Sequence, residues 1–243
     1  MTQIIATLAL VLALAPAAVD QQAPTTWTPP SPEQVRERWN ATFRLGAPTL
    51  KREPSSVLVA TVQGRKPGKA LDLGTGEGRN ALFLAEQEWQ VTGVDISDVA
   101  IAQAKSNAVD RKLKLEAIVG DLDTYDFGVE QWDLITSFYM HSWHDRSKTD
   151  VAARIYQALK PGGLLVIEGF AKPEVTFGFS AAELSSAYAR LRILRNESVV
   201  DEADWDKGNK SHIVRFVAEK RQEALGDMSR RVGPLSVLKR HRP

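Results

Sequence analysis

Short apolar runs typical of β-strands alternate, between residues 69 and 168, with stretches whose apolar residues recur at helical spacing. Parallel strands need a crossover connection of a dozen or more residues, and a helix usually supplies it. This alternation therefore predicts an α/β domain in which a parallel sheet is covered by helices on both faces. We expect strands at residues 69–73, 90–94, 113–119, 133–138 and 164–168, and helices at residues 78–88, 98–110 and 148–159.

Further elements are expected around this region. A helix begins at the Ser-Pro-Glu run of residues 31–33 and extends to about residue 43, because serine is a favoured N-cap and proline a favoured first helical residue. A shorter helix, capped by Ser55 or Ser56, is expected to end near residue 62. The remaining predictions are a Lys-Pro-Gly-Gly turn at residues 160–163, a helix at residues 181–189, and an edge hairpin with strands at residues 191–199 and 212–220.

The composition is that of a globular protein with one domain. The chain has 243 residues, of which 43% are apolar and 25% charged, and a single core can be built from this length. The net charge of +1 gives no overall basic character, so we expect no nucleic-acid partner. The absence of cysteine excludes disulfides, zinc–thiolate centres and cysteine nucleophiles, and no metal site is expected.

The first residues form an apolar segment unlike the rest of the chain. Residues 4–19 carry no charge and contain small residues suited to cleavage after Ala17 or Ala18. The segment is shorter than the about 20 residues of a membrane span, so residues 1–18 are interpreted as a signal peptide. Export without a membrane span in the mature chain would follow. An uncleaved N-terminal anchor and a cytoplasmic protein with an unusual N-terminus are the alternatives.

Three parts are expected beyond this segment. A linker rich in proline and threonine covers residues 19–30, and the α/β domain, including its N-terminal helices, covers residues 31–220. Residues 221–243 form a basic tail, which is interpreted as a solvated segment or as a contact with an anionic surface.

A glycine-rich turn follows the first strand of the alternating region. It reads DLGTGEGRN at residues 72–80, and glycines at a strand-to-helix turn let the backbone approach a ligand closely. Dinucleotide-binding turns have the spacing G-x-G-x-x-G, but Arg79 stands where the third glycine would be. The carboxylate of Asp72, just before the turn, suits a cationic ligand and would repel a phosphate.

Acidic residues also end the next two strands. Asp95 can bind both hydroxyls of a ribose from this position, and Asp121 can accept a hydrogen bond from an adenine amino group. With Asp72 they occupy the carboxyl ends of adjacent parallel strands, the edge at which open α/β sheets bind ligands. Capping of a helix or turn is the alternative role of Asp95 and Asp121, but three acids in register favour a nucleoside site.

These motifs resemble those of the class I S-adenosylmethionine-dependent methyltransferases. The similarity extends from about residue 39 to residue 220, and the Gly-Arg-Asn-Ala run is similar to the small-molecule branch that includes tellurite-resistance and thiopurine-type enzymes. The resemblance implies a Rossmann-like, seven-stranded, mostly parallel sheet of order 3-2-1-4-5-7-6, with S-adenosylmethionine as the cofactor. It is carried by ALDLGTGEGRNALFLAEQEWQVTGVDIS (70–97), GDLDTYDF (120–127), WDLITSFYMH (132–141) and LKPGGLLVIEGF (159–170).

The resemblance also implies which residues contact the cofactor. The glycine-rich turn would hold the methionine part, the tips of the second and third strands would hold the nucleoside, and the end of the fourth strand would lie beside the sulfonium. The residues implied are Asp72, Gly74, Gly76 and Gly78 for methionine, Asp95 and Ile96 for ribose, Asp121 and Leu122 for adenine, and Ser137 with Phe138 for the sulfonium side.

Candidate bases follow the fourth strand. The run YMHSWHD at residues 139–145 contains Tyr139 and two of the chain's four histidines, His141 and His144. Histidine titrates near neutral pH and is a common general base, so these three residues are the catalytic candidates, with helix capping or a surface location as the alternative for the histidines. Two roles are open to the aromatic residues Trp39, Phe43 and Trp143. They form the roof of an apolar acceptor pocket, or they pack in the core without a functional role.

The sequence thus predicts transfer of a methyl group from S-adenosylmethionine to a small molecule by in-line displacement. Soft acceptors such as a thiolate need little help from a base, whereas a hydroxyl acceptor needs one. A catalytically inert protein that binds S-adenosylmethionine or S-adenosylhomocysteine is one alternative, and an NAD-dependent oxidoreductase, against which Arg79 argues, is another. Many nucleic-acid amino methyltransferases carry an Asn/Asp-Pro-Pro-aromatic motif where this chain has Ser-Phe-Tyr-Met at residues 137–140.

Overall fold

The computed structural model describes residues 29–47, 50–147, 150–172, 178–205 and 208–222 of the chain. The predicted signal segment, the linker up to residue 28 and the basic tail from residue 223 onward lie outside the described residues. Within the described residues, no helix combines the length and the apolar character that crossing a bilayer requires.

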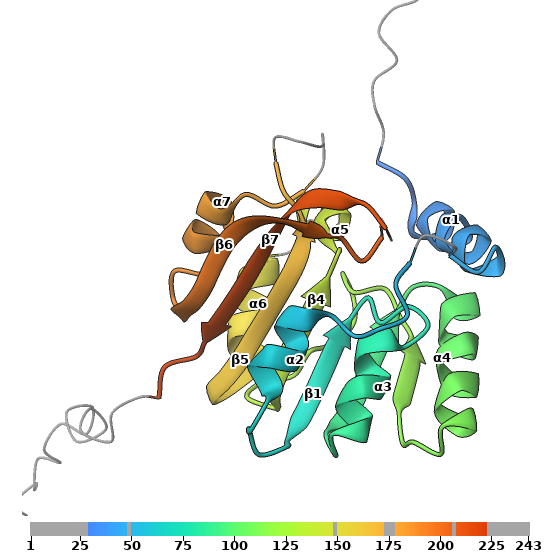
Figure 1. The fold of residues 1–243 in the computed structure, drawn as a ribbon, viewed down its shortest axis with the longest axis horizontal. Coiled ribbons are helices and arrows are strands. Elements are labelled where there is room, and N and C mark those ends of the chain that lie inside the picture. Colours follow the sequence, from blue (N-terminus) through green and yellow to red (C-terminus); the bar gives the residue numbers. More distant parts are fainter. Residues whose placement is uncertain (1–28, 48–49, 148–149, 173–177, 206–207, 223–243) are drawn as a thin grey trace, which may run out of the picture.

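Seven strands form one sheet with the order β3-β2-β1-β4-β5-β7-β6 (Figure 1). The strands from β3 to β5 pair in parallel, whereas β7 pairs antiparallel with both β5 and β6. This Rossmann-like order confirms the topology implied by the family resemblance. The strands are β1 Lys69–Leu73, β2 Gln90–Asp95, β3 Glu116–Val119, β4 Trp132–Phe138, β5 Leu159–Phe170, β6 Arg192–Glu202 and β7 Lys210–Glu219.

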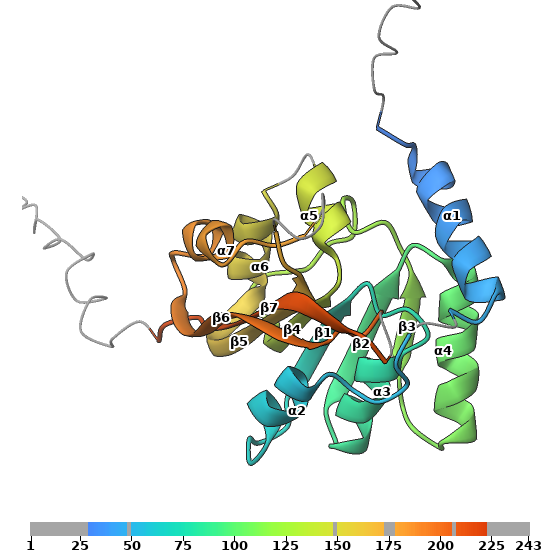
Figure 2. The same ribbon diagram turned by 45° about the horizontal axis from the view of Figure 1, so that its top comes forward.

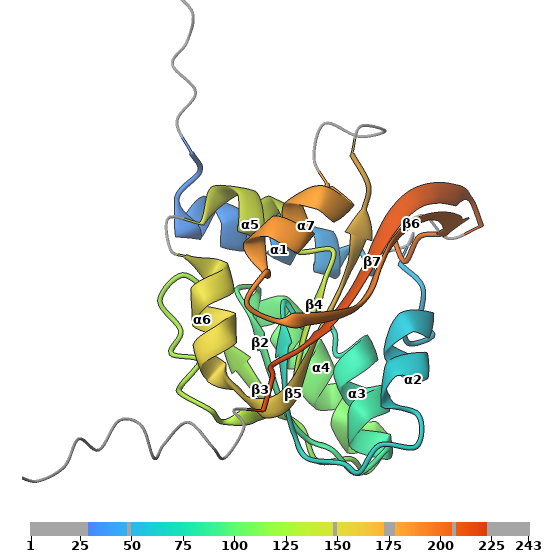
Figure 3. The same cartoon turned by 90° about the vertical axis from the view of Figure 1, so that its left-hand side faces the viewer.

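Helices cover both faces of the sheet. Helices α2, α3 and α4 lie on one face, and α6 and α7 lie on the other (Figure 3). The first helix, α1, packs beside α4 near the carboxyl ends of the strands (Figure 2). The helices are α1 Pro32–Arg44, α2 Ser56–Val62, α3 Arg79–Glu86, α4 Asp98–Asp110, α5 His141–Arg146, α6 Val151–Ala158 and α7 Ala181–Ala187.

Two predicted N-caps are present as hydrogen bonds. The Ser31 hydroxyl accepts from the Gln34 amide (3.3 Å) while the Gln34 side chain accepts from the Ser31 amide (2.8 Å), which is a complete capping box. The Ser97 hydroxyl accepts from the Ala100 amide (3.1 Å) at the start of α4. Ser55 precedes α2 as predicted, but its hydroxyl donates to Glu168 (3.0 Å) instead of capping the helix.

Several boundaries differ from the prediction, and local hydrogen bonds explain two of them. Strand β3 begins at Glu116 and not at residue 113, because the Leu113 amide bonds back to the Ala108 carbonyl (2.8 Å) and Lys112 has a φ of 55°, so these residues close α4. Helix α6 begins at Val151, later than the expected residue 148, because the Asp150 carboxylate caps it by accepting from the Ala153 amide (2.9 Å).

The Lys-Pro-Gly-Gly run at residues 160–163 was expected to be a turn before the fifth strand. It lies instead within β5, where the register against β4 shifts between Trp132 and Leu134. The last residues of the described chain hold this irregular stretch, since the Gly162 amide donates to the Lys220 carbonyl (2.7 Å) and the Lys220 amide to the Gly163 carbonyl (2.9 Å). The prediction was wrong in beginning the strand only at residue 164, because pairing with the chain after β7 was not visible in the sequence.

The main core lies between the sheet and helices α6 and α7. Ile155 of α6 is completely buried in this core. We expect Ile155→Ala to lower the free energy of unfolding by about 2–5 kcal/mol, because it removes buried methyl groups and leaves a cavity. Denaturant unfolding measures this change, and Val109→Ala, at a side chain that is 75% exposed, is the matched control. A loss below about 1 kcal/mol for Ile155→Ala would contradict the assigned packing.

Candidate functional site

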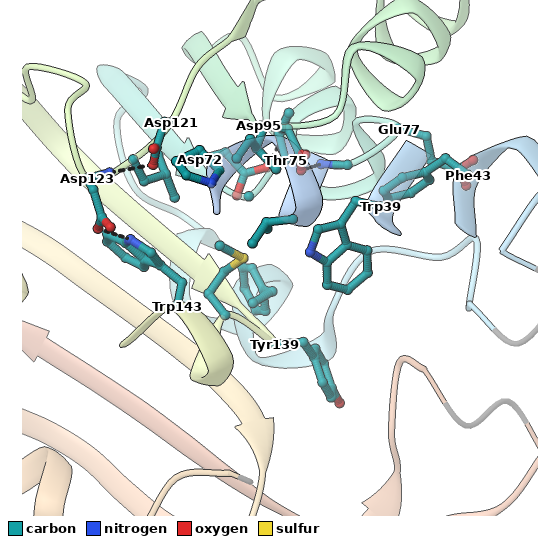
Figure 4. A pocket seen from close by; sticks show the side chains of 18 of the residues that line it. Trp39, Phe43, Asp72, Thr75, Glu77, Asp95, Asp121, Asp123, Tyr139 and Trp143 are labelled. Atoms are coloured by element: carbon teal, nitrogen blue, oxygen red, sulfur yellow. Dashed lines mark hydrogen bonds between the residues drawn. The ribbon is translucent and has the colours of Figure 1, made fainter. Parts of the chain in front are cut away.

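A cavity of about 540 Å³ opens at the carboxyl ends of β1, β2 and β4 (Figure 4). In this view Asp121, Asp72 and Asp95 form a row on one side, and Trp143, Tyr139 and Trp39 lie opposite them. The structure therefore brings together residues from several strand ends, as the sequence predicted. The predicted site residues in its wall are Asp72, Gly74, Gly76, Asp95, Ile96, Asp121, Leu122, Phe138 and Tyr139, together with the aromatic candidates Trp39, Phe43 and Trp143.

The glycine-rich turn lets backbone and side chains pack closely. Gly74 has a φ of 73°, which strains larger residues, and a Cβ atom there would lie 2.1 Å from the Met140 sulfur, so the Met140 side chain would have to move. Gly78 has a φ of 88° and is the N-cap of α3, but it is not part of the cavity wall. A Cβ atom on Gly78 would lie 3.2 Å from Ala104 of α4. The space at Gly78 thus serves the packing of α3 on α4.

Asp72 ends β1 as a buried carboxylate. It accepts hydrogen bonds from the hydroxyls of Thr75 (2.8 Å) and Thr136 (2.6 Å). Burial raises the pKa of Asp72, and the two threonine hydrogen bonds and the Arg79 charge act against this increase. The sequence prediction missed both threonines, although each stands near a motif residue.

Asp95 ties the tip of β2 to the glycine-rich turn. One carboxylate oxygen accepts from the Gly76 amide (2.9 Å) and the other from the Ser97 amide (2.8 Å). Burial raises the pKa of Asp95 to about 6, and the neighbouring Asp72 adds to the increase. Because part of its hydrogen-bonding capacity remains, this carboxylate can still accept from a ligand hydroxyl.

Two acids lie beyond β3. Asp121 accepts from the Asp123 amide (3.0 Å), and Leu122 between them is buried. The Asp123 carboxylate accepts from the Trp143 indole (2.8 Å) and the Ser147 hydroxyl (2.7 Å), so it fixes α5 against the loop. The sequence analysis did not single out Asp123, which lines the cavity.

The predicted catalytic histidines lie outside the cavity wall, and so does Ser137. The His144 ring is 3.2 Å from the buried Ser137 hydroxyl and packs edge-on against Phe179, with ring centroids 5.2 Å apart. The His141 ring also packs edge-on against Phe179, at 5.9 Å. Helix α5 turns both rings toward β5 and the segment before α7, a direction that the spacing of the residues did not reveal.

The surroundings keep both histidines neutral. Burial lowers the pKa of His144 to about 4, with a smaller contribution from His141, and burial also lowers the pKa of His141. Tyr139 does line the cavity, but burial raises the pKa of its phenol. The Tyr139 hydroxyl accepts a hydrogen bond from the Asp204 amide (2.8 Å). At neutral pH the phenol is therefore protonated.

Aromatic rings close the cavity from two distant parts of the chain. Trp39 and Phe43 come from α1, and Trp205 follows β6. The Trp205 ring centroid lies 5.9 Å from that of Trp39 and 6.4 Å from that of Phe43. The sequence prediction included Trp39 and Phe43 but missed Trp205, because it placed this residue in a polar turn between two strands.

Asn40 attaches α1 to the tip of β2. This side chain is only 4% exposed, and its amide nitrogen donates to Asp98 (2.7 Å) while its oxygen accepts from the Ser97 hydroxyl (2.7 Å). The Arg36 side chain also donates to the Ile96 carbonyl (3.2 Å). The helix that carries two cavity aromatics is thereby fixed to the same loop as Asp95.

Comparison with known sequences agrees with this geometry. Residues 70–163 match the family described as "Methyltransferase domain". The ribosomal RNA small subunit methyltransferase C of Alcanivorax borkumensis is 31% identical over 156 residues, which cover 59% of this chain and 47% of that protein. The chain spans about half the length of the first curated relatives that it matches.

Solved structures share the fold. TehB from Haemophilus influenzae has a TM-score of 0.60 at 21% identity, over 69% of this chain and 62% of that chain. The 1,6-didemethyltoxoflavin-N1-methyltransferase of Burkholderia thailandensis, with bound S-adenosylhomocysteine, has a TM-score of 0.62 at 20% identity, over 84% and 98% of the two chains. Residues 70–163 thus match a methyltransferase domain, and the sheet that contains them has the fold of these solved structures, one of which holds S-adenosylhomocysteine.

Proposed function

We propose that this chain methylates a small, uncharged and largely apolar molecule whose nucleophile, such as a thiol, ionises near neutral pH without a protein base. The observation that carries the proposal is the cavity wall itself. Acids line the side near β2 and β3, aromatic rings line the opposite side, and no histidine belongs to the described wall. An acceptor with a further charged group, or one whose nucleophile needs a histidine base, would find no suitable partner there.

The row of acids fits the cofactor by its chemistry. Carboxylates at the tips of three adjacent strands suit a ligand with one excess positive charge and several hydroxyl and amino donors. We assign Asp72 and the glycine-rich turn to the methionine part, Asp95 to the ribose hydroxyls, and Asp121 with Leu122 to the adenine. When bound, S-adenosylmethionine supplies a methyl group on a sulfonium, which is already strongly electrophilic.

The other charged groups of the wall are engaged within the protein. Arg79 forms an ion pair with Asp204, and Glu77 forms one with Arg52. The Asp123 carboxylate already accepts two hydrogen bonds. An acceptor with a charged group besides its nucleophile would have to break one of these pairs, which favours an acceptor that is otherwise uncharged and is held by apolar contact.

The missing base limits the nucleophile. The Tyr139 phenol is protonated at neutral pH, and His141 and His144 are turned away from the cavity. What the wall provides is alignment of the acceptor and exclusion of water, and these supply much of the rate of an in-line displacement. A thiol with a pKa of about 8.5 is partly ionised at neutral pH, whereas a phenol at about 10 is hardly ionised at all.

A turnover screen tests the proposal. Purified protein is incubated with S-adenosylmethionine labelled in the methyl group and with matched apolar acceptors: thiophenol, phenol, aniline and benzoate. We expect methylation of thiophenol to exceed that of the other three by about tenfold or more, because only the thiol is ionised and soft. Labelling of phenol with a base-dependent pH profile, or of benzoate, would contradict the proposed acceptor class. Binding of the cofactor without any turnover would favour the inert alternative.

The assignment of Asp95 makes a separate prediction. Asp95→Ala is expected to weaken binding of S-adenosylhomocysteine by about a hundredfold or more, because charge-assisted hydrogen bonds to two hydroxyls contribute about 1.5–3 kcal/mol each. Isothermal titration calorimetry measures the affinity, and Asp110→Asn at the exposed end of α4 is the control. Normal binding by a folded Asp95→Ala protein would show that the ribose lies elsewhere.

The same carboxylate predicts a pH dependence. With a pKa of about 6 in the free protein, Asp95 is ionised at pH 7.5 and mostly protonated at pH 5, and only the ionised form accepts from both hydroxyls. Affinity for S-adenosylhomocysteine should therefore fall about tenfold between pH 7.5 and pH 5. Asp95→Asn should lower the affinity at both values and remove this dependence.

Asn40 is predicted to hold α1 over the cofactor. Asn40→Ala leaves the Ser97 hydroxyl and the Asp98 carboxylate without these contacts, and we expect a loss of about 1–3 kcal/mol in the free energy of unfolding. Limited proteolysis should cut the variant within or near α1 faster than the wild type, and S-adenosylhomocysteine should bind less tightly. Thr42→Ala, at a hydroxyl that bonds only within α1 (3.1 Å to the Arg38 carbonyl), is the control. Equal proteolysis of the two variants would refute this role.

A further inference from the structure

Arg79, which stands where a dinucleotide-binding turn has its third glycine, is held in a buried ion pair. Its guanidinium pairs with Asp204, and the two side chains are only 8% and 6% exposed. The same guanidinium donates to the Glu53 carbonyl (2.6 Å). Asp204 follows β6, so the pair joins the first residue of α3 to the connection between the last two strands.

Asp204 is fixed by its backbone as well. Its amide donates to the Tyr139 hydroxyl (2.8 Å), and its carbonyl accepts from the Lys51 amide (2.8 Å). Side chain, amide and carbonyl of one residue are thus bound to three different segments of the chain. Such a complete set of contacts defines the position of the next residue, Trp205.

Trp205 lies in the cavity wall and reaches the rings of α1. The order of the sheet indicates which end of the cavity it closes. Asp95 ends β2 and Asp121 follows β3, both on one side of β1, whereas Tyr139 follows β4 on the other side. Since Asp204 is bound to Tyr139, the chain enters the cavity wall from the β4 side, and the Trp205 ring reaches across to Trp39 and Phe43 of α1.

We propose that Trp205 determines the size of the acceptor, and that the ion pair of Arg79 and Asp204 positions it. This inference rests on the proposed function, because it divides the same cavity into a cofactor end and an acceptor end. A planar tryptophan ring held against Trp39 gives one rigid apolar wall to an aromatic acceptor. Its replacement by a smaller side chain should admit larger acceptors without changing the cofactor end.

The experiment compares a small and a large thiol. Thiophenol and 2-naphthalenethiol are each offered as acceptors to the wild type, Trp205→Phe, Trp205→Ala and Asp204→Asn. The kcat and KM for methylation are measured for each protein and each thiol. We expect Trp205→Ala to raise kcat/KM for 2-naphthalenethiol relative to thiophenol by about tenfold or more, with a smaller shift for Trp205→Phe. Affinity for S-adenosylhomocysteine, which also reports correct folding, should stay within about twofold of the wild type in all variants.

A double-mutant cycle separates positioning from general stability. Asp204→Asn alone should raise the ratio of kcat/KM for 2-naphthalenethiol to kcat/KM for thiophenol, as Trp205→Ala does. It should also raise the KM for thiophenol. Added to Trp205→Ala, the Asp204→Asn substitution should change this ratio no further, because the side chain that Asp204 positions is gone. Additive effects of the two substitutions would overturn the positioning role. Arg192→Gln, which removes an exposed ion pair with Glu219 at the other end of the same hairpin, should leave both thiols unaffected.

Binding without chemistry distinguishes failure of this inference from failure of the proposed function. Calorimetry with thioanisole and 2-(methylthio)naphthalene, on protein saturated with S-adenosylhomocysteine, should show the same change in size preference for Trp205→Ala. If this change is seen in a protein that methylates neither thiol, the role of Trp205 in acceptor size would be supported while the proposed reaction would be refuted. No binding of either thioether by the wild type would overturn the inference, and so would a tenfold loss of S-adenosylhomocysteine affinity in Trp205→Phe.

Discussion

The site depends on keeping two neighbouring carboxylates inside the protein. Asp72 and Asp95 are both buried, and their proximity raises the pKa of Asp95 further. Backbone amides of the glycine-rich turn and of the segment after β2, together with two threonine hydroxyls, stabilise the charges that burial disfavours. The remaining negative potential is complementary to a sulfonium and an ammonium. The same hydrogen bonds hold the turn against the tip of β2, so the backbone of the site and its charge are set together.

Two segments far apart in the sequence complete this cavity, and each is attached by one polar residue with several partners. Asn40 joins α1 to the loop after β2, and Asp204 joins the hairpin of β6 and β7 to α3 and Tyr139. Apolar contact between Trp39, Phe43 and Trp205 alone would allow the two segments to slide, because such contact is not directional. The buried hydrogen bonds and the ion pair define where the rings stand. The aromatic wall is therefore as rigid as the polar contacts beneath it.

Much of the fold could be predicted from the sequence, because alternating periodicity and serine N-caps are local signals. The bounds of β1 and α4 and the presence of the C-terminal hairpin follow from them. The acids at the strand tips could be placed for the same reason, since a residue at the end of a parallel strand has only one edge to occupy. The direction of His141 and His144 could not be predicted, because α5 is a short helix without a periodic signal and its rotation is set by packing on Phe179. Trp205 was missed because its role depends on tertiary contacts of Asp204.

The position of the histidines also changes what chemistry the cavity can support. A histidine beside the sulfonium would allow hydroxyl acceptors, since it could take the proton as the new bond forms. With both rings outside the cavity wall, the proposed acceptor would have to lose its proton before it is aligned. The proposed reaction would then select acceptors by their own acidity and by their fit to the aromatic wall. Under this proposal, the burial of two imidazoles and the placement of one indole would both limit the range of molecules that can be methylated.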